Sequence, residues 1–249
     1  MTTTTSDAVV LVTGANRGLG RALVEELLRA GAARVYAGAR DPKTLEGLFP
    51  GAEGRVVPLA LDVTDAESLA RAAARAEDVT LLINNAGLLA SGRVTTDPVA
   101  SIAQDFAVNF YGTLAASRAF LPALVRAGAA RRAAIVNVLS VASLSNLAVL
   151  GGYSASKAAA YSLTQALRAE LASQGVRVHA ALPGAIDTDM VRAMEMPKSS
   201  PALVARGILE GLAAGDDEIL PDPMARDLFA TWRRDFKEME RQFAAMSAG

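Results

Sequence analysis

Short apolar runs alternate with amphipathic segments along most of this chain. The runs are rich in Val, Ile, Leu and Ala, which is typical of strands buried on both faces of a parallel sheet. We predict such strands at residues 8–13, 34–39, 55–61, 79–83, 133–140 and 176–182. Because helical patterns separate these runs, strand and helix alternate. This order predicts one α/β domain of Rossmann type, a doubly wound parallel sheet of about seven strands with helices on both faces.

Helical periodicity fills several of the intervening segments. Residues 65–77 form a predicted helix whose N-cap is either Thr64 or Asp65. Residues 101–125 form one long predicted helix, and an Ala-rich helix is expected over residues 153–173. Each of these helices follows a predicted strand or lies between two of them, as a doubly wound sheet requires.

A last helix is predicted over residues 224–246. Apolar side chains recur there with helical spacing opposite a charged face, at Leu228, Trp232, Phe236, Met239 and Phe243. This stripe packs either on its own domain or on a partner subunit, and the sequence leaves both possibilities open.

Length and composition agree with a single domain. The chain has 249 residues, 51% of them hydrophobic, which is enough to bury a sizeable core. There is no internal repeat and no low-complexity linker, so we expect one domain over residues 8–249 after a disordered tail at residues 1–7. No sequence feature marks a second domain.

Charge and cysteine content narrow the possible partners. The net charge is −1, and Lys and Arg are scattered, so nucleic acid and anionic lipid are not expected as partners. The chain has no Cys, no apolar run of about 18 residues and no signal-peptide pattern. We therefore expect a soluble, cytoplasmic protein that does not bind membranes and acts on small molecules. We assign no metal ligands.

A glycine-rich turn joins the first predicted strand to the helix after it. The segment Thr13–Gly20 is TGANRGLG, and a strand, glycine turn and helix in this order point backbone N–H groups at a diphosphate. The candidate cofactor contacts in this turn are Gly14, Asn16, Arg17, Gly18, Leu19 and Gly20. The spacing G-x3-G-x-G differs from the commonest fingerprint, G-x-G-x-x-G. Glycine-rich turns also occur for purely conformational reasons.

The end of the second predicted strand favours NADP over NAD. Dinucleotide-binding folds usually place there an acidic residue that binds the adenosine ribose, but this chain has Ala39 followed by Arg40. No carboxylate repels a 2′-phosphate, while Arg40 and Arg17 are both candidates to bind one. The alternative is that both arginines are ordinary solvated surface charges.

Further candidate cofactor contacts follow the other predicted strands, at the edge where such sheets bind ligands. They are Asp62, Val63, Asn85, Ala86, Gly87, Pro183, Gly184, Ile186 and Thr188. Asp62 is placed to contact an adenine amino group, but a turn or cap residue would look the same. The only histidine, His179, lies within a predicted strand, where we assign it no catalytic role.

Residues 188–200 suggest a flap over an apolar substrate. The segment DMVRAMEMPKSS combines three Met residues with a Pro and two Ser, which suits an adaptable surface. The alternative is that these Met side chains belong to the core. Leu144, Leu147, Leu150, Met190 and Met194 make an apolar substrate pocket plausible.

Ser140, Tyr153 and Lys157 form the candidate catalytic group. If Tyr153 opens a helix, Lys157 lies one turn later on the same face, close enough for its ammonium to favour the ionised phenol. A nearby opposite charge lowers a phenol pKa of about 10 by about 1 to 3 units. Ser140 can hydrogen-bond the same substrate oxygen, which suggests carbonyl chemistry. Asn109, inside a largely apolar helix, either joins a proton relay to Lys157 or faces solvent or a neighbouring helix.

Together, the motifs resemble those of the short-chain dehydrogenase/reductase family over roughly residues 8–190. In chain order they are TGANRGLG, Asp62, NNAG, Asn109, Ser140, Tyr153-x3-Lys157 and PGAIDT. The resemblance implies that Tyr153 is the general acid and that Ser140 orients the carbonyl. It implies that Lys157 lowers the pKa of Tyr153 and binds the nicotinamide ribose, and that Asn109 completes the proton relay.

The same resemblance implies the cofactor contacts. Asp62 would contact adenine, Asn85–Gly87 would line the cofactor site, and Thr188 would hold the carboxamide. Ala39 followed by Arg40 is similar to the members that prefer NADP. The C-terminal part matches less well, because EILPDP replaces a common glycine-rich ending.

We therefore predict an NADPH-dependent reductase that converts an apolar ketone or aldehyde to an alcohol, reversibly. The family implies a homodimer or homotetramer. The competing hypothesis is a regulatory or scaffold protein that binds NADP(H) without turnover. The complete set of four candidate catalytic residues argues against that alternative.

Overall fold

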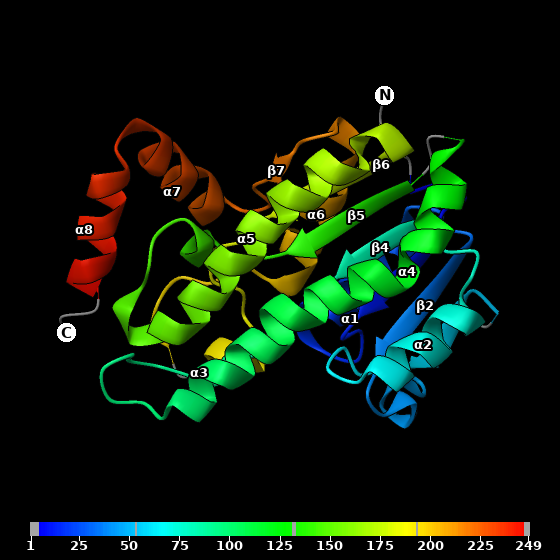
Figure 1. Ribbon diagram of the computed structural model, residues 1–249, viewed down its shortest axis with the longest axis horizontal. Coiled ribbons are helices and arrows are strands. Elements are labelled where there is room, and N and C mark those ends of the chain that lie inside the picture. Colours follow the sequence, from blue (N-terminus) through cyan, green and yellow to red (C-terminus); the bar gives the residue numbers. More distant parts are fainter. Residues whose placement is uncertain (1–4, 53, 131–132, 193, 247–249) are drawn as a thin grey trace.

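Seven parallel strands form one sheet through the middle of the molecule (Figure 1). The computed structural model describes residues 5–52, 54–130, 133–192 and 194–246. The strands are β1 (Val9–Thr13), β2 (Arg34–Ala39), β3 (Val56–Ala60), β4 (Leu81–Asn84), β5 (Ala133–Val138), β6 (Val176–Ala181) and β7 (Glu218–Ile219). They lie in the order β3-β2-β1-β4-β5-β6-β7. The carboxyl ends of β1 and β4 therefore meet at the switch point where folds of this type bind ligands.

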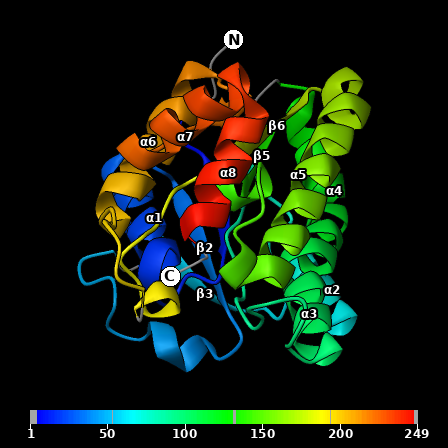
Figure 2. The same cartoon turned by 90° about the vertical axis from the view of Figure 1, so that its left-hand side faces the viewer.

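Helices cover both faces of the sheet (Figure 2). The main ones are α1 (Gly18–Arg29), α2 (Ala66–Arg75), α4 (Thr113–Gly128), α5 (Gly151–Leu171) and α6 (Pro201–Ala214). α1 and α6 lie on one face, whereas α2, α4 and α5 lie on the other. Each face has its own apolar core: Val10 and Val12 belong to one cluster and Leu11 to the other. Burial on both faces explains why the strands have continuous apolar runs. The predicted doubly wound α/β fold is confirmed.

The six predicted strands are all present, with ends that differ from the predicted ones by at most two residues. The helix expected over residues 65–77 is α2, and its cap is Asp65, whose side chain accepts a hydrogen bond from the Glu67 backbone N–H. Strand β7 and helix α6 were not predicted. β7 has only two residues, too few to show a period, but α6 begins with the Ser200 cap and Pro201, a recognisable start signal.

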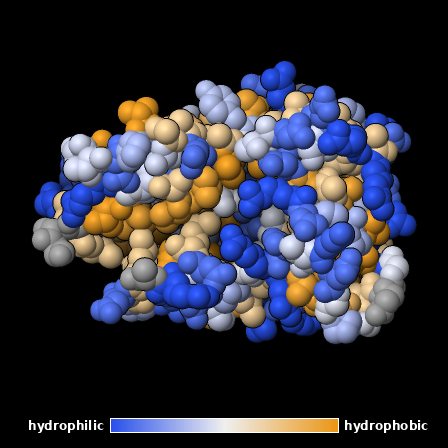
Figure 3. Space-filling view, turned by 90° about the horizontal axis from the view of Figure 1, so that it is seen from below, coloured by the Kyte–Doolittle hydropathy of each residue, from blue (hydrophilic) through white to orange (hydrophobic). Residues whose placement is uncertain are grey.

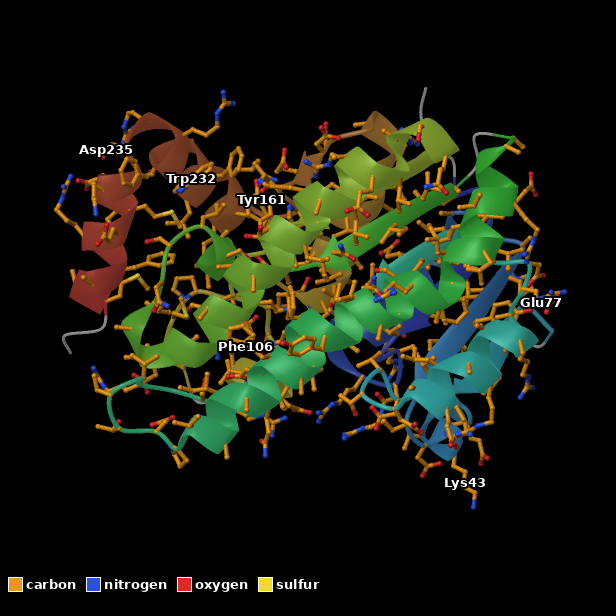
Figure 4. All side chains as sticks on the ribbon, viewed as in Figure 1. Lys43, Glu77, Phe106, Tyr161, Trp232 and Asp235 are labelled. Carbon is orange, nitrogen blue, oxygen red and sulfur yellow. The ribbon has the colours of Figure 1, made fainter. Side chains whose placement is uncertain are left out.

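The helix expected over residues 101–125 is longer and is not uniform. It consists of α3 (Val99–Phe106), a π-helical turn (Ala107–Gly112) and α4. Figure 4 labels Phe106, the last residue of α3. The π-helical turn contains Asn109, and such turns frequently occur at functional sites. The helix expected to open at Tyr153 begins two residues earlier, at Gly151.

The prediction of a single helix over residues 224–246 is wrong. The structure has α7 (Pro223–Arg234) and α8 (Phe236–Met246), separated by Asp235, which Figure 4 labels between them. Asp235 is extended, and its carboxylate accepts a hydrogen bond from Lys237 N, so it ends one helix and caps the next. Met239 and Phe243 are buried with Val141 in an apolar cluster. Leu228 and Trp232 pack against the same cluster, so the apolar stripe packs on its own domain except at Phe236, which is 60% exposed.

The segment predicted as a flap is a loop whose two ends are joined by backbone hydrogen bonds. Asp187 N donates to Ser199 O, and Ser199 N donates to Ala185 O. Between these bonds lies a short 3-10 helix, Asp189–Val191, whose Met190 is 45% exposed. Residue 193 of the predicted flap and residues 1–4 of the predicted tail lie outside the described residues. Asp7, at the end of that tail, donates its N–H to Gly31 O.

Two absences hold for the described part of the chain. None of its helices is both long and apolar enough to cross a membrane. No group of three or more potential metal-ligating side chains occurs within it.

His179 should make the protein less stable in acid. It is 1% exposed in β6, its Nδ1 lies 2.6 Å from Asp216 O, and its Nε2 has no partner. Burial lowers the pKa of His179. The unfolded chain therefore binds a proton at His179 more readily than the folded chain does. The folded state keeps its full free energy of unfolding above the ordinary histidine pKa and loses part of it as the pH falls below that value.

The test of this coupling is chemical unfolding between pH 8 and pH 5. His179→Asn retains a donor for Asp216 O but cannot titrate. The free energy of unfolding of the wild type should fall relative to that of the variant below about pH 6.5, with a limiting slope of about 1.4 kcal/mol per pH unit. If the free energies of unfolding of the two proteins change with pH in parallel, His179 is not the group that destabilises the protein in acid.

Candidate active site

The glycine-rich turn forms a cradle at the N-terminus of α1. Gly14 and Gly18 both have positive φ, +67° and +52°. A side chain at Gly20 would overlap the Gly14 carbonyl oxygen and come within 2.6 Å of Asn85 Nδ2. No side chain caps α1, because Arg17 is extended and makes no cap hydrogen bond. The backbone and helix N-terminus therefore fit a diphosphate.

The ends of β1 and β4 are tied together at this cradle. Thr13 Oγ1 accepts hydrogen bonds from Asn85 N and Ala86 N, at 3.0 and 2.9 Å. Asn85 Nδ2 donates to Thr13 O and Gly14 O, at 2.9 and 3.1 Å. The Asn85 side chain thus holds the glycine-rich turn in place. Thr13 was not among the predicted site residues, although a Thr at the end of an apolar strand and before Gly is a visible signal.

Two predicted contacts direct their side chains into the cores. Leu19 is 7% exposed and belongs to the apolar cluster on the α1 face. Val63 belongs to the cluster on the opposite face, and its Cγ2 would lie 2.7 Å from a Cβ at Gly112. Only the backbone of these residues is therefore available to a cofactor.

The predicted phosphate-binding arginines have different surroundings. Arg40 is exposed directly after the buried Ala39 at the end of β2. The pKa of Asp62 is lowered, chiefly by the hydrogen bond from the Thr64 hydroxyl and also by the charge of Arg40. Arg17 Nη1 instead lies 3.7 Å from Asp189 Oδ2, an exposed ion pair that is worth little in water. Arg40 is therefore the better placed of the two for a 2′-phosphate beside the ribose.

The loop at residues 183–188 closes over the same edge. Val141 N donates to Pro183 O, and Gly184 N donates to Asp222 Oδ2 at 2.9 Å. Asp222 is fully buried and also caps α7 through Ala225 N. Thr188 lies beside the start of α1, since its Cγ2 is 3.1 Å from a Cβ built at Gly18. Asp222, which accepts the hydrogen bond that holds this loop, was not among the predicted site residues.

Ser140, Tyr153 and Lys157 come together at the carboxyl end of β5. Ser140 Oγ accepts a hydrogen bond from Ala142 N at 3.1 Å, and the Ser140 hydroxyl is close enough to the Tyr153 phenol to lower its pKa. Lys157 Nζ donates to Val138 O at 2.9 Å and lies 5.8 Å from the centroid of the Tyr153 ring. Because Tyr153 and Lys157 are one turn apart on α5, they share a face of the helix, as predicted.

The pKa values at this group differ from the expectation. Burial raises the pKa of Tyr153 to about 12, and the hydrogen bond from Ser140 only partly opposes it. Burial lowers the pKa of Lys157 to about 8. The predicted lowering of the Tyr153 pKa by Lys157 is therefore not found, because the ammonium faces the ring and burial dominates. At neutral pH Tyr153 keeps its proton, and Lys157 remains mostly charged.

Asn109 is buried at the back of this group. Its Oδ1 accepts from Leu88 N at 2.9 Å, and its Nδ2 donates to Leu88 O and to Ser156 Oγ at 2.8 and 2.9 Å. A Cβ at Gly87 would lie 3.4 Å from Asn109 Oδ1 and 3.6 Å from Lys157 Nζ. Asn109 therefore faces the site rather than solvent, and it fixes the start of the loop after β4.

Apolar side chains surround the mouth of the site. Figure 3 shows a hollow lined with hydrophobic residues on the side of the molecule where α7 and α8 lie. Val141, directly after Ser140, packs with Met239 and Phe243 of α8, and Leu144, Leu147 and Trp232 pack around them. The two C-terminal helices thus supply an apolar wall next to the Ser140 segment.

Comparison with known proteins agrees with this geometry. The family model described as short chain dehydrogenase matches residues 8–198. The probable oxidoreductase EphD of Mycobacterium tuberculosis is 36% identical over 191 residues, which cover 74% of this chain but only 32% of that protein. The chain therefore spans about a third of the length of the first curated relatives that it matches.

Two solved structures are similar over nearly the whole chain. A short chain dehydrogenase from Burkholderia cenocepacia, in complex with NADP, is 41% identical with a TM-score of 0.89, covering 96% of this chain and 98% of that one. A short chain dehydrogenase/reductase from Burkholderia phymatum, in complex with NAD, is 26% identical with a TM-score of 0.82, covering 96% of each chain. The cofactor thus differs between two proteins that share the fold.

Proposed function

Because this chain belongs to the short-chain dehydrogenase family, we propose that it is an NADP(H)-dependent oxidoreductase that reduces a ketone or aldehyde to an alcohol, reversibly. The observation that carries this proposal is the meeting of the Ser140 hydroxyl, the Tyr153 phenol and the Lys157 ammonium at the carboxyl end of β5. These groups can hydrogen-bond a carbonyl oxygen and protonate it.

Each of these residues has a distinct task in the proposed reaction. NADPH, when bound, supplies the hydride to the carbonyl carbon. Tyr153 donates its proton to the carbonyl oxygen, while Ser140 holds that oxygen by a hydrogen bond. Lys157, anchored on Val138 O, lies 5.8 Å from the centroid of the Tyr153 ring, and the family resemblance assigns it the nicotinamide ribose of the cofactor.

NADP is supported by this chain's own residues as well as by its relatives. Ala39 offers no carboxylate to the ribose, and Arg40 is exposed beside Asp62. The Burkholderia cenocepacia protein, at 41% identity, binds NADP. The apolar wall formed by α8 and the Ser140 segment supports an apolar carbonyl substrate. We also propose a cytoplasmic location for a chain that has no Cys.

The test is consumption of NADPH and of NADH with a panel of ketones and aldehydes that differ in apolar size, followed by absorbance. We expect turnover with NADPH and an advantage for larger apolar substrates over charged ones. If NADPH binds but neither any carbonyl compound nor any alcohol in the reverse direction is converted, the non-catalytic alternative replaces this proposal.

We also expect a homodimer or homotetramer, built on the helix expected over residues 101–125, which ends in α4, and on α5. Both helices are Ala-rich, which allows close approach between copies. The chain mass is 25.8 kDa, so light scattering at micromolar concentration should give at least about twice that value. A mass equal to one chain would contradict this expectation.

A further inference from the structure

A buried carboxylate lies behind the catalytic group and has no role in the reaction described above. Asp105 on α3 is fully buried, with a side chain that accepts three hydrogen bonds. Ala90 N donates to Oδ1 at 2.8 Å, Ser91 N donates to Oδ2 at 3.1 Å, and the Ser91 hydroxyl also donates to Oδ2. Burying a carboxylate is costly unless such bonds replace its water. All three hydrogen bonds to the Asp105 carboxylate come from one short loop.

The loop is residues 88–92, which leave the cofactor edge directly after Gly87. Asn109 holds Leu88 by both its backbone N–H and its carbonyl, and Asp105 holds Ala90 and Ser91. Asp105 and Asn109 are four residues apart, one helical turn, so both tethers come from the same face of the helix. The loop is therefore fixed at two points rather than one.

The far side of this loop packs on the first turn of α5. Gly151 N donates to Gly92 O at 2.8 Å. A side chain at Gly152 would overlap Ser91 Oγ and lie 2.9 Å from Ile102 Cγ1. Since Tyr153 follows Gly152, the position of Ser91 bears directly on the backbone that carries the acid.

The charge of Asp105 also reaches the catalytic pair. The carboxylate raises the pKa of Tyr153 and that of Lys157, in both cases less strongly than burial acts. The charged groups facing the pair are Asp105 from α3 and the Lys157 ammonium itself. Residues 88–92, the π-helical turn, β5 and the 3-10 helix Val141–Ser143 contain no acidic or basic side chain.

We propose that Asp105 is a positioning residue for carbonyl reduction: it clamps residues 88–92 against the first turn of α5 and thereby holds Tyr153 in its reactive position. This inference rests on the proposed function, because it assigns Asp105 a part in that reaction. A small displacement of an acid from its substrate can cost about a hundredfold in rate, so a clamp of this kind has a measurable effect.

The experiment compares four variants of the full chain with the wild type. Asp105→Asn removes the charge and sets an NH2 group against the Ser91 N–H, while Ser91→Ala removes only the hydroxyl bond. The double variant tests whether the two residues act together. Asp65→Asn is the matched control, since that carboxylate also accepts a backbone N–H but lies at the start of α2.

We expect Asp105→Asn to lower kcat by about tenfold to a hundredfold, with the KM for the ketone changed by less than about threefold. Ser91→Ala should lower kcat by about threefold, and the double variant should be no slower than Asp105→Asn, because residues in one network are not additive. Hydrogen exchange of the Ala90 and Ser91 amides should be at least about tenfold faster in Asp105→Asn. Asp65→Asn should change none of these quantities.

The pH profile separates positioning from general structural support. Loss of the carboxylate lowers the pKa of Lys157, so the alkaline limb of kcat should move to lower pH in Asp105→Asn but stay in place in Ser91→Ala. Faster amide exchange with an unchanged kcat and an unchanged limb would overturn the proposal. If Asp105→Asn does not fold, Ser91→Ala decides, and wild-type kcat in that variant overturns it. A wild type that is inactive with every carbonyl compound overturns the proposed function instead.

Discussion

Replacing Tyr153 by Phe should remove most turnover and leave NADPH binding nearly intact. The ring still packs at the start of α5, but the proton that the carbonyl oxygen receives is gone. General acid catalysis contributes about 10²- to 10⁴-fold in rate, and we expect kcat to fall by that factor. The Kd for NADPH, measured by fluorescence titration, should change by less than about threefold.

The same helix offers a matched control. Tyr161 lies further along α5, where its hydroxyl is 3.4 Å from Glu218 Oε1, away from the Ser140 group. Tyr161→Phe also removes one phenol hydroxyl, but kcat should stay within about twofold of the wild type because no reacting atom is nearby. Wild-type turnover in Tyr153→Phe would show that another group supplies the proton.

The sheet could be predicted from sequence because burial on both faces has a strong signature. β1 and β5 are apolar at nearly every position, and that pattern alone placed their ends within one and two residues of the observed ones. The two-residue strand β7 carries no such period. The break at Asp235 was missed because no Gly or Pro marks it, and a stripe of apolar residues continues across it in both helices.

The convergence of Ser140, Tyr153 and Lys157 could be predicted from the sequence, but the pKa values of Tyr153 and Lys157 could not. The four-residue spacing of Tyr153 and Lys157 gives their shared helix face, since spacing is a local property. The pKa of Tyr153 depends on burial, which arises from segments distant in sequence, and burial reverses the expected direction. Asp105 was missed for a related reason: a lone Asp in a helix is usually exposed, and only its contacts with Ala90 and Ser91 show otherwise.

Cofactor choice should depend mainly on Arg40. The wild type should prefer NADPH to NADH by about tenfold to a hundredfold in kcat/KM, as expected for charge-assisted hydrogen bonds to a phosphate. Arg40→Ser should remove most of this preference. Arg17→Ser should have a smaller effect, because the Arg17 guanidinium already lies 3.7 Å from the Asp189 carboxylate.

The double variant Ala39→Asp with Arg40→Ser should go further and reverse the preference. A carboxylate at the end of β2 would accept the ribose hydroxyls of NADH and repel the 2′-phosphate of NADPH. Ala39 is only 3% exposed, so the new carboxylate costs stability wherever it fails to reach water or ribose. Thermal unfolding must therefore accompany the kinetics, with Arg40→Ser alone as the folding control. A wild-type kcat/KM ratio near one, or a ratio that none of these changes moves in folded protein, would show that neither arginine contacts the cofactor phosphate.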